Sequence, residues 1–192
     1  KIKYGRRIIM ARKKKEYYID GITYFSKTLY DLHVLLSNNK YAKHFIIPTA
    51  IKKSKYGAQK IVVNHINFDS IMEAEYYLYL LEQKAKKEIK SFEMQVSFDL
   101  LPKKKNKFTG KTILPVKYIA DFVITDKSGT IKVVDIKGRE TADFKLKKKM
   151  FFYFYPNLDF RCVQWDGTQQ KWRDLDEINK DRRARKRLKK KK

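Results

Sequence analysis

The sequence contains a single cysteine, Cys162, which excludes an internal disulfide and suits a reducing compartment. Three histidines accompany it, at positions that form no Cys/His cluster for zinc. No apolar run approaches the roughly 20 residues that span a bilayer, and the apolar step at residues 8–10 is too brief for a signal peptide. These absences predict a cytoplasmic chain that has no membrane anchor.

Acidic residues are scarce relative to basic ones. The 192 residues include 46 Lys and Arg against 21 Asp and Glu, which gives a formal net charge of +25. Such an excess favours polyanionic partners, either nucleic acid or an anionic membrane surface. The lack of a membrane-spanning run favours nucleic acid. Hydrophobic residues make up 43% of the chain and aromatic residues 14%, so a packed core is expected despite the charge.

The chain divides into three predicted parts. Residues 1–53 form a basic extension with one helix at 28–36. The apolar face of that helix consists of Leu29, Leu32 and Leu36. Residues 54–166 form one α/β domain. Residues 167–192 are polar and end in a basic run, which predicts a solvated and mobile tail.

The central part has the pattern of a mixed sheet flanked by helices. Ser70 and Glu73 form a capping box at the start of the first helix. A second helix runs from about Thr141 to Phe154, and its predicted buried stripe consists of Ala142, Leu146, Met150 and Phe154. Four strands are predicted at 92–100, 118–125, 130–136 and 160–165. The predicted class is α/β, with the element order α-β-β-β-α-β.

Two acidic residues and one lysine stand in strands that are otherwise apolar. Asp135 and Lys137 are two residues apart, so their side chains point to the same face of a strand. Asp121 interrupts the preceding apolar strand, where aspartate is unfavourable. Two carboxylates on neighbouring strands can share a hard cation such as Mg²⁺, or Mn²⁺ in its place. We therefore expect Asp121 and Asp135 to hold a metal, and Lys137 to assist chemistry at a phosphate.

Each of these assignments has a structural alternative. Asp135 and Lys137 could form a plain ion pair, with Asp121 capping a turn. Glu73 is a third candidate for catalysis and metal binding, because a helix packed on the sheet can direct its first turn at the acidic residues. It would equally complete the capping box, and Glu75 is the fallback.

Further polar residues are candidates for contacts with nucleic acid. Gln95 lies in the first strand, where a solvent-facing position explains it equally well. Lys147 and Lys148 lie on the second helix and could contact backbone phosphate or simply face solvent. The C-terminal run could lie along nucleic acid or only solubilise the chain. Its candidate residues are Arg182, Arg183 and Arg185.

An acid on a helix, an Asp in one strand and Asp-x-Lys in the next resemble the PD-(D/E)xK superfamily, which includes restriction endonucleases and Holliday-junction resolvases. Asp121 matches the first acid of that motif, and Asp135 and Lys137 match its last part. Ala120 stands where the superfamily name has proline.

A narrower resemblance covers about residues 55 to 165. This stretch is similar to a phage and prophage family of nuclease-like proteins, often regarded as resolvase-like. The similarity rests on the segments 68–77, 118–122 and 135–138, and on the Phe- and Lys-rich helix that ends at residues 155–156. It implies a restriction-endonuclease-like core and a magnesium-dependent endonuclease acting on DNA, including branched DNA, in the cytoplasm of a bacterial or phage-infected cell.

Three functions are open at this point. The first is an endonuclease, which as a homodimer could cut two strands symmetrically. The second is a non-catalytic nucleic-acid-binding module that keeps the nuclease fold. The third is an interaction protein of a mobile element, which would bind a protein partner through residues 1–53. DNA and RNA are alternatives as the nucleic acid.

Overall fold

The computed structural model describes residues 17–19, 22–24, 27–47 and 60–189. The chain forms two compact units, Lys1–Ile71 and Met72–Lys192. The division falls later than the predicted boundary after residue 53, because strands that follow residue 60 pair within the first unit. No helix in the described ranges is both long and apolar enough to cross a membrane.

The first unit is built from short strands and one helix. Its described elements are β1 (Tyr17–Ile19), β2 (Ile22–Tyr24), α1 (Lys27–Ser37), β3 (Phe45–Ile46), β4 (Ile61–Val63) and β5 (Ile66–Phe68). β1 and β2 pair as an antiparallel hairpin, and β3, β4 and β5 form an antiparallel sheet. α1 confirms the helix predicted at 28–36, and its three leucines are buried. Residues 1–16 of the predicted extension lie outside the described residues.

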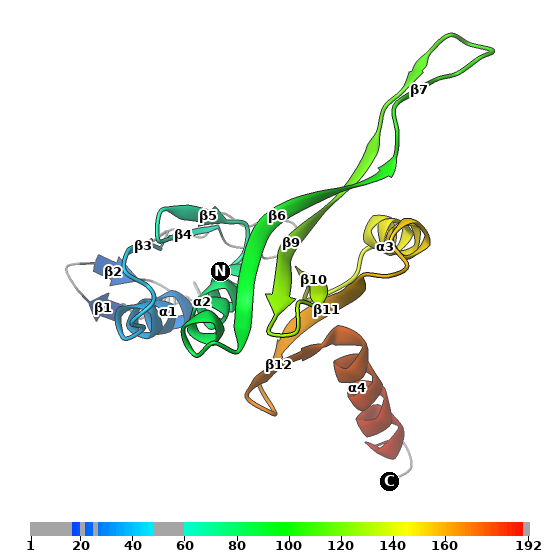
Figure 1. Cartoon of the computed structure of the whole chain (residues 1–192). Helices are drawn as coiled ribbons and strands as arrows, with labels where there is room; N and C mark the ends of the chain where they lie inside the picture. The colour runs from blue at the N-terminus through cyan, green and yellow to red at the C-terminus, as the bar shows by residue number, and fades with distance from the viewer. Residues whose placement is uncertain (1–16, 20–21, 25–26, 48–59, 190–192) are drawn as a thin grey trace, which may run out of the picture. The chain divides into compact units, whose positions relative to one another are not determined.

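The second unit is organised around a five-stranded mixed sheet (Figure 1). Its strands are β6 (Ile89–Leu101), β9 (Val116–Asp126), β10 (Ile131–Ile136), β11 (Asp159–Asp166) and β12 (Lys171–Asp174). They lie in the order β12-β11-β10-β9-β6; β10 and β11 run parallel, and the other neighbours run antiparallel. With α2 (Ile71–Ala85) before β6 and α3 (Ala142–Phe154) before β11, the predicted α/β order α-β-β-β-α-β is confirmed.

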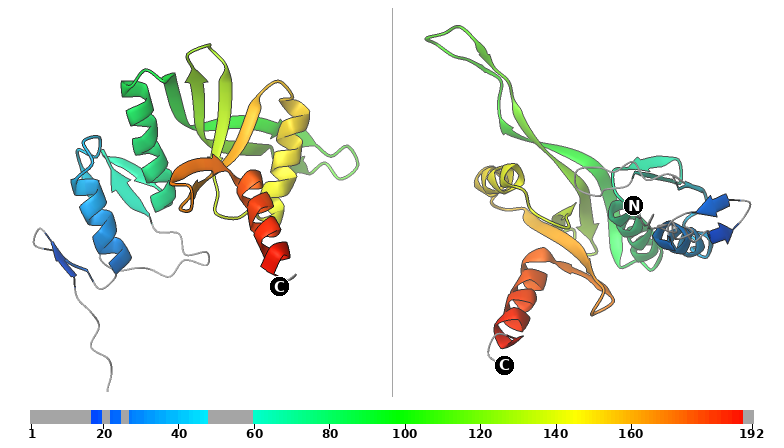
Figure 2. Two further views of the ribbon diagram at one scale, coloured as in Figure 1. Left: turned by 90° about the horizontal axis from the view of Figure 1, so that it is seen from below. Right: turned by 180° about the vertical axis from the view of Figure 1, so that it is seen from behind.

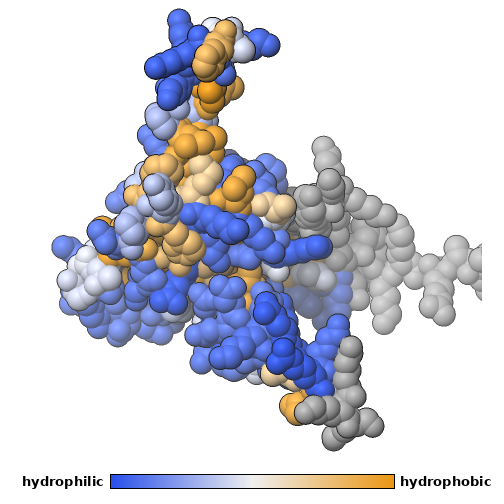
Figure 3. Space-filling view, turned by 90° about the vertical axis from the view of Figure 1, so that its right-hand side faces the viewer, coloured by the Kyte–Doolittle hydropathy of each residue, from blue (hydrophilic) through white to orange (hydrophobic). Residues whose placement is uncertain are grey.

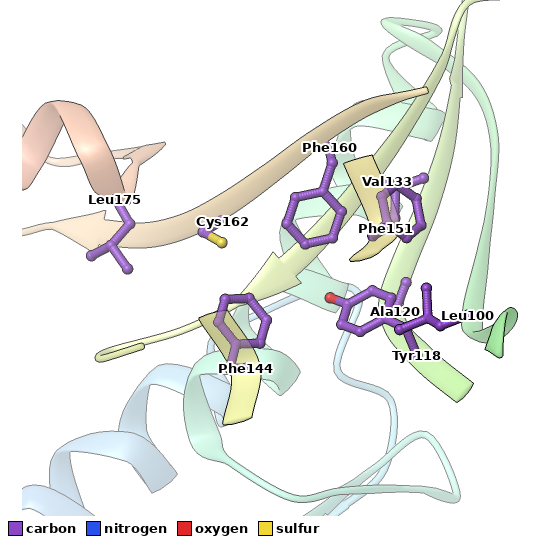
Figure 4. Close-up of a cluster of buried hydrophobic side chains, with 9 residues drawn as sticks. All are labelled: Leu100, Tyr118, Ala120, Val133, Phe144, Phe151, Phe160, Cys162 and Leu175. Carbon is purple, nitrogen blue, oxygen red and sulfur yellow. The ribbon is translucent and has the colours of Figure 1, made fainter. Parts of the chain in front are cut away.

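The two helices cover opposite faces of the sheet (Figure 2). Val133 of β10 packs in a cluster with Phe151 of α3. The next residue, Val134, pairs with Phe122 of β9, which contacts Tyr76 of α2. Successive strand residues point to opposite faces, so α2 and α3 lie on different sides. Figure 4 shows the cluster on the α3 side, made of Leu100, Tyr118, Ala120, Val133, Phe144, Phe151, Phe160, Cys162 and Leu175.

The buried face of α3 differs from the predicted stripe, which is wrong. Phe144 and Phe151 are buried, whereas Leu146 is 60% exposed and Phe154 is 45% exposed. Phe144 and Phe151 are seven residues apart, or two helical turns, so they share a face. That face packs on rings of the sheet, among them Phe160 of β11. The large rings, rather than the most regular spacing, therefore determine which side of α3 is buried.

Replacing Phe151 with Ala is expected to lower the free energy of unfolding by about 3–5 kcal/mol, because the substitution leaves a cavity in the core. Phe154→Ala on the same helix should lower it by less than about 1 kcal/mol, because that ring is partly exposed. Urea denaturation of both variants measures the difference. Equal losses would reinstate the predicted stripe.

The predicted C-terminal tail is structured as far as residue 189, so the expectation of a mobile tail is wrong. β12 joins the edge of the sheet, and α4 (Leu175–Lys189) follows it with Leu175 buried in the core cluster. Arg173 of β12 fixes the helix, because its guanidinium lies 2.9 Å from the carboxylate of Asp181. The composition of this segment is dominated by charged residues, so it did not indicate these few anchoring residues. The basic residues of α4 are exposed, as expected.

Candidate functional site

Strand register brings Asp121 and Asp135 next to each other. The last paired residues of β9 and β10 are Phe122 and Val134, so Asp121 and Asp135 are the next residues to stand opposite. The ladder ends there, and the Ile136 N–H donates instead to Asp121 Oδ2 at 2.7 Å. Directly opposite residues of antiparallel strands project from the same face of a sheet. The two predicted carboxylates are therefore neighbours.

β9 changes its facing at Asp121. Tyr118 and Ala120 pack in the cluster on the α3 side, whereas Phe122 packs against Tyr76 of α2. In a regular strand, residues 118, 120 and 122 would share one face. The backbone therefore turns over between Ala120 and Phe122, which is the position of Asp121.

Gln95 marks the same irregularity on the neighbouring strand β6. The pairs on either side of it place Gln95 opposite Asp121. Its φ of 53° lies in the left-handed region, which is strained for a residue with a side chain. Local irregularities of this kind re-aim side chains and are frequent beside active sites. The side chain of Gln95 is exposed, which confirms a solvent-facing position, and its contact with nucleic acid stays a prediction.

Asp135 is held from two sides. The residue is 1% exposed. Its Oδ1 accepts a hydrogen bond from the Tyr118 hydroxyl at 2.5 Å, and its Oδ2 lies 2.8 Å from Lys137 Nζ. The second contact lacks hydrogen-bond geometry, so Oδ2 has no hydrogen-bond donor among the described residues. The Lys137 ammonium compensates the charge of this oxygen, and a cation held by both carboxylates would share it.

The pair of carboxylates suits a divalent cation. Burial first, and then the charge of Asp135, raise the pKa of Asp121 to about 7, although Lys137 and the Ile136 N–H oppose the rise. The described residues contain no preformed group of three His, Cys, Asp or Glu side chains that could hold a metal. Mg²⁺ requires only one or two carboxylates, with waters and phosphate oxygens completing its shell. Asp121 and Asp135 fit that requirement.

Lys137 is a fixed positive charge beside this pair. Burial lowers the pKa of its ammonium, but the carboxylates of Asp135 and Asp121 outweigh burial and raise the pKa above its ordinary value. The side chain is 33% exposed, so the ammonium is within reach of solvent. At neutral pH, Lys137 can therefore neutralise an anion but cannot accept a proton.

Of the two candidate acids on α2, Glu73 and Glu75, Glu73 lies near the carboxylate pair. Its charge raises the pKa values of both Asp121 and Lys137. Glu75 is not among the largest influences on either residue, and burial raises its own pKa. Residues two apart on a helix point about 200° apart, which explains the difference. Glu73 is thus the acid of α2 placed to take part, and its role stays a prediction.

Tyr118 belongs to this site, although its role did not emerge from the sequence. The residue is 4% exposed and donates its hydroxyl to Asp135. Burial, followed by the charge of Asp135, raises its pKa far above the ordinary range, so the phenol stays a neutral donor. A tyrosine at a buried strand position usually needs a hydrogen-bond partner. That requirement was the available signal.

Tyr118→Phe is expected to lower the free energy of unfolding by about 1–3 kcal/mol, because the buried Asp135 carboxylate loses its donor. Tyr153→Phe is the matched control, since Tyr153 lies on α3 and is 80% exposed. Urea denaturation at neutral pH in the presence of a chelator gives the comparison. An unchanged midpoint for Tyr118→Phe would show that the hydroxyl does not stabilise Asp135.

Two of the other predicted contact residues, Lys147 and Lys148, pair with acids outside the carboxylate pair. Lys148 is only 16% exposed, and its ammonium lies 2.9 Å from Glu140 and 3.6 Å from Asp176. It is therefore engaged in ion pairs rather than presented to a phosphate. Lys147 lies 3.6 Å from Asp143. The exposed basic candidates on α4 are Arg182, Arg183 and Arg185.

Comparison with known proteins gives one family. The model of a family described as "Protein of unknown function (DUF1064)" matches residues 53–171, which include Glu73, Asp121, Asp135 and Lys137. No curated protein and no solved structure matches the chain significantly. Because the match covers more than half of the 192 residues, the chain belongs to the DUF1064 family.

Proposed function

We propose that this chain is a metal-dependent endonuclease of the PD-(D/E)xK kind, which hydrolyses phosphodiester bonds in DNA. One observation carries the proposal: strand register sets Asp121 opposite Asp135, and Asp135 Oδ2 lies 2.8 Å from the Lys137 ammonium. Two acids able to share a cation beside a fixed positive charge suit a reaction in which negative charge grows on a phosphate. The net charge of +25 supplies attraction to nucleic acid.

Each residue of the site has a role in this reaction. Asp121 and Asp135 would supply carboxylate oxygens to Mg²⁺ or Mn²⁺. A cation bound there supplies Lewis acidity toward the phosphate and lowers the pKa of coordinated water. The Tyr118 hydroxyl and the Ile136 N–H hold the two carboxylates in place. Lys137 presents a partly exposed ammonium, which can pair with a phosphate oxygen as its charge increases.

One observation favours a second candidate, a nucleic-acid-binding module without catalysis. Lys137 already contacts Asp135 as an ion pair, and a purely structural pair would adopt the same arrangement. A module of this kind would bind nucleic acid equally well with and without divalent cations, and it would cut neither DNA nor RNA.

Cleavage of labelled DNA tests the proposal. Linear duplex, four-way-junction DNA and RNA of the same sequence are incubated with magnesium, manganese or a chelator. The wild-type protein is expected to cut at least one of the DNA substrates, and only when a divalent cation is present. Tight binding without cutting in any cation would reject the endonuclease and leave the binding module.

Glu73→Gln is expected to lower the cleavage rate by about 10–100-fold, because the Glu73 charge acts on both Asp121 and Lys137. Glu75→Gln on the same helix should cleave within about twofold of wild type. Steady-state rates on the preferred DNA measure both. The pair also controls for a contaminating nuclease, which neither change would affect. Equal rates would restrict Glu73 to capping α2.

A further inference from the structure

β6 and β9 continue past the sheet as a two-stranded arm, defined here as residues 101–117 (Figures 1 and 2). Pro102 and Pro115 interrupt the ladder between the two strands, because proline has no amide hydrogen to donate. Pairing then resumes between β7 (Lys104–Lys105) and β8 (Thr112–Ile113). The arm is therefore an ordered hairpin rather than an irregular loop.

The charge of the arm has one sign. Residues 101–117 contain lysines and no Asp or Glu. These lysines, all exposed, are Lys103, Lys104, Lys105, Lys107, Lys111 and Lys117. Lys117, at the base, lies 3.3 Å from Asp99. The others have no carboxylate partner in the part of the chain that the structure describes. This surface is suited to a polyanion and would repel a second copy of itself.

Hydrophobic side chains stand among these lysines (Figure 3). Phe108 is 99% exposed, and Leu114 is 72% exposed. Burial of a fully exposed phenyl ring against a binding partner lowers the free energy. Lysines on both sides of Phe108 make an apolar protein surface a poor cover, whereas a nucleic acid offers phosphates and flat bases together.

The turn that carries Phe108 is organised by its own hydrogen bonds. The side-chain oxygen of Asn106 accepts from the N–H groups of Phe108 at 2.9 Å and Thr109 at 3.0 Å. The Gly110 N–H donates to the Asn106 carbonyl at 2.9 Å, and Gly110 has φ of +66°, which glycine adopts without strain. The ring is thus held at the end of the arm by a preformed turn, without help from the core.

We propose that the arm is a wedge for branched DNA, in which Phe108 stacks on a base at the branch point and the lysines lie along the flanking phosphates. It rests on the proposed function and specifies the substrate of that same enzyme. Base–aromatic stacking tolerates any sequence, and apolar side chains that enter a base step kink the duplex. Unstacking bases consumes free energy, so the ring gains most where a branch has already opened the stack.

Binding in the presence of a chelator tests the wedge separately from cleavage. The full chain is titrated with a four-way junction and with a linear duplex of matched length. Phe108→Ala is expected to weaken junction binding on the order of tenfold, and to leave binding of the linear duplex within about twofold. Tyr153→Ala removes an exposed ring from α3 instead, and should change neither affinity.

Substitution of three lysines with Gln tests the pairing of the arm with phosphates. The variant combines Lys104→Gln, Lys105→Gln and Lys107→Gln, and should bind both DNAs more weakly. The slope of the logarithm of its DNA association constant against the logarithm of salt concentration should be shallower by about 0.9 for each phosphate that the arm no longer neutralises. The matched control replaces three exposed lysines outside the arm, Lys84, Lys90 and Lys171. This control should keep the wild-type salt dependence.

Several outcomes would overturn the wedge. The first is a junction affinity that Phe108→Ala leaves unchanged. The second is an equal loss of affinity for the junction and the linear duplex in Phe108→Ala. The third is a wild-type chain that binds neither DNA. Sedimentation that shows a dimer broken by Phe108→Ala would assign the ring to a second copy of the chain. Failure of the proposed function is distinguishable: Phe108-dependent junction binding with no cleavage in any divalent cation would keep the wedge and reject the nuclease. Divalent-cation-dependent cleavage, together with junction binding that Phe108→Ala leaves unchanged, would keep the nuclease and reject the wedge.

Discussion

Replacement of Asp135 with Asn is expected to lower the rate of magnesium-dependent DNA cleavage by a factor on the order of a thousand or more. Asn keeps the shape of the side chain and an oxygen for the Tyr118 hydroxyl. It removes the charge that faces Lys137 and that would hold a cation together with Asp121. DNA affinity in a chelator should not fall, because removal of a carboxylate does not weaken attraction to phosphate.

Single-turnover cleavage and filter binding on the same DNA separate these two effects. Asp99→Asn is the matched control, because Asp99 lies on β6 and its side chain is 71% exposed. Calorimetric titration with Mn²⁺ should show a site in the control that is absent in Asp135→Asn. If the Asp135 variant cleaves within about tenfold of wild type, its contact with Lys137 is structural and the nuclease site lies elsewhere.

Asp121→Asn is expected to change stability and activity in opposite directions. Burial, with help from Asp135, raises the pKa of Asp121 from 3.8 to about 7. Between these pH values the folded chain retains a proton that the unfolded chain releases. The stabilisation is therefore complete below about pH 4 and is lost as pH rises through about 7. Asn does not titrate, so the variant should escape this loss, while its cleavage falls because a cation-binding carboxylate is gone.

Melting temperatures in a chelator at pH 5 and pH 8 test this coupling. The melting temperature of the variant relative to wild type should be a few degrees higher at pH 8 than at pH 5. Magnesium at pH 8 should raise the melting temperature of wild type and not of the variant, because only wild type keeps both carboxylates. A difference that is the same at both pH values would mean that Asp121 has an ordinary pKa.

Much of the core was predictable because its signals are local. Asp135 and Lys137 share a face by the two-residue period of a strand, and the alternation around Gln95 marks β6 without any knowledge of its neighbours. The helix at α1 likewise follows from leucine spacing. Each of these patterns is written within about ten consecutive residues. They needed no information about which segments meet in space.

The remaining features depend on contacts between distant segments. The hydroxyl of Tyr118 finds Asp135 across 17 positions of sequence, and the reversal of facing at Asp121 shows only when two helices are in place. The predicted stripe on α3 failed for the same reason, because Phe160 of β11 selects Phe151 as its partner. The high charge of the C-terminal residues predicted a mobile tail. The ion pairs of Arg173 with Asp166 and Asp181, which help to fold this segment, join residues that the composition does not connect.

The position of Cys162 gives the protein an internal reporter of its own opening. This sole thiol pairs in register with Asp135, is 2% exposed, and has a pKa that burial raises to about 12. Thiolate is the reactive form, so the closed sheet is protected against alkylation both sterically and chemically. The rate of alkylation therefore reports how often the cluster around Cys162, which includes Phe151 of α3 and Leu175 of α4, opens to solvent. Local opening around this thiol can thus be measured without an engineered label.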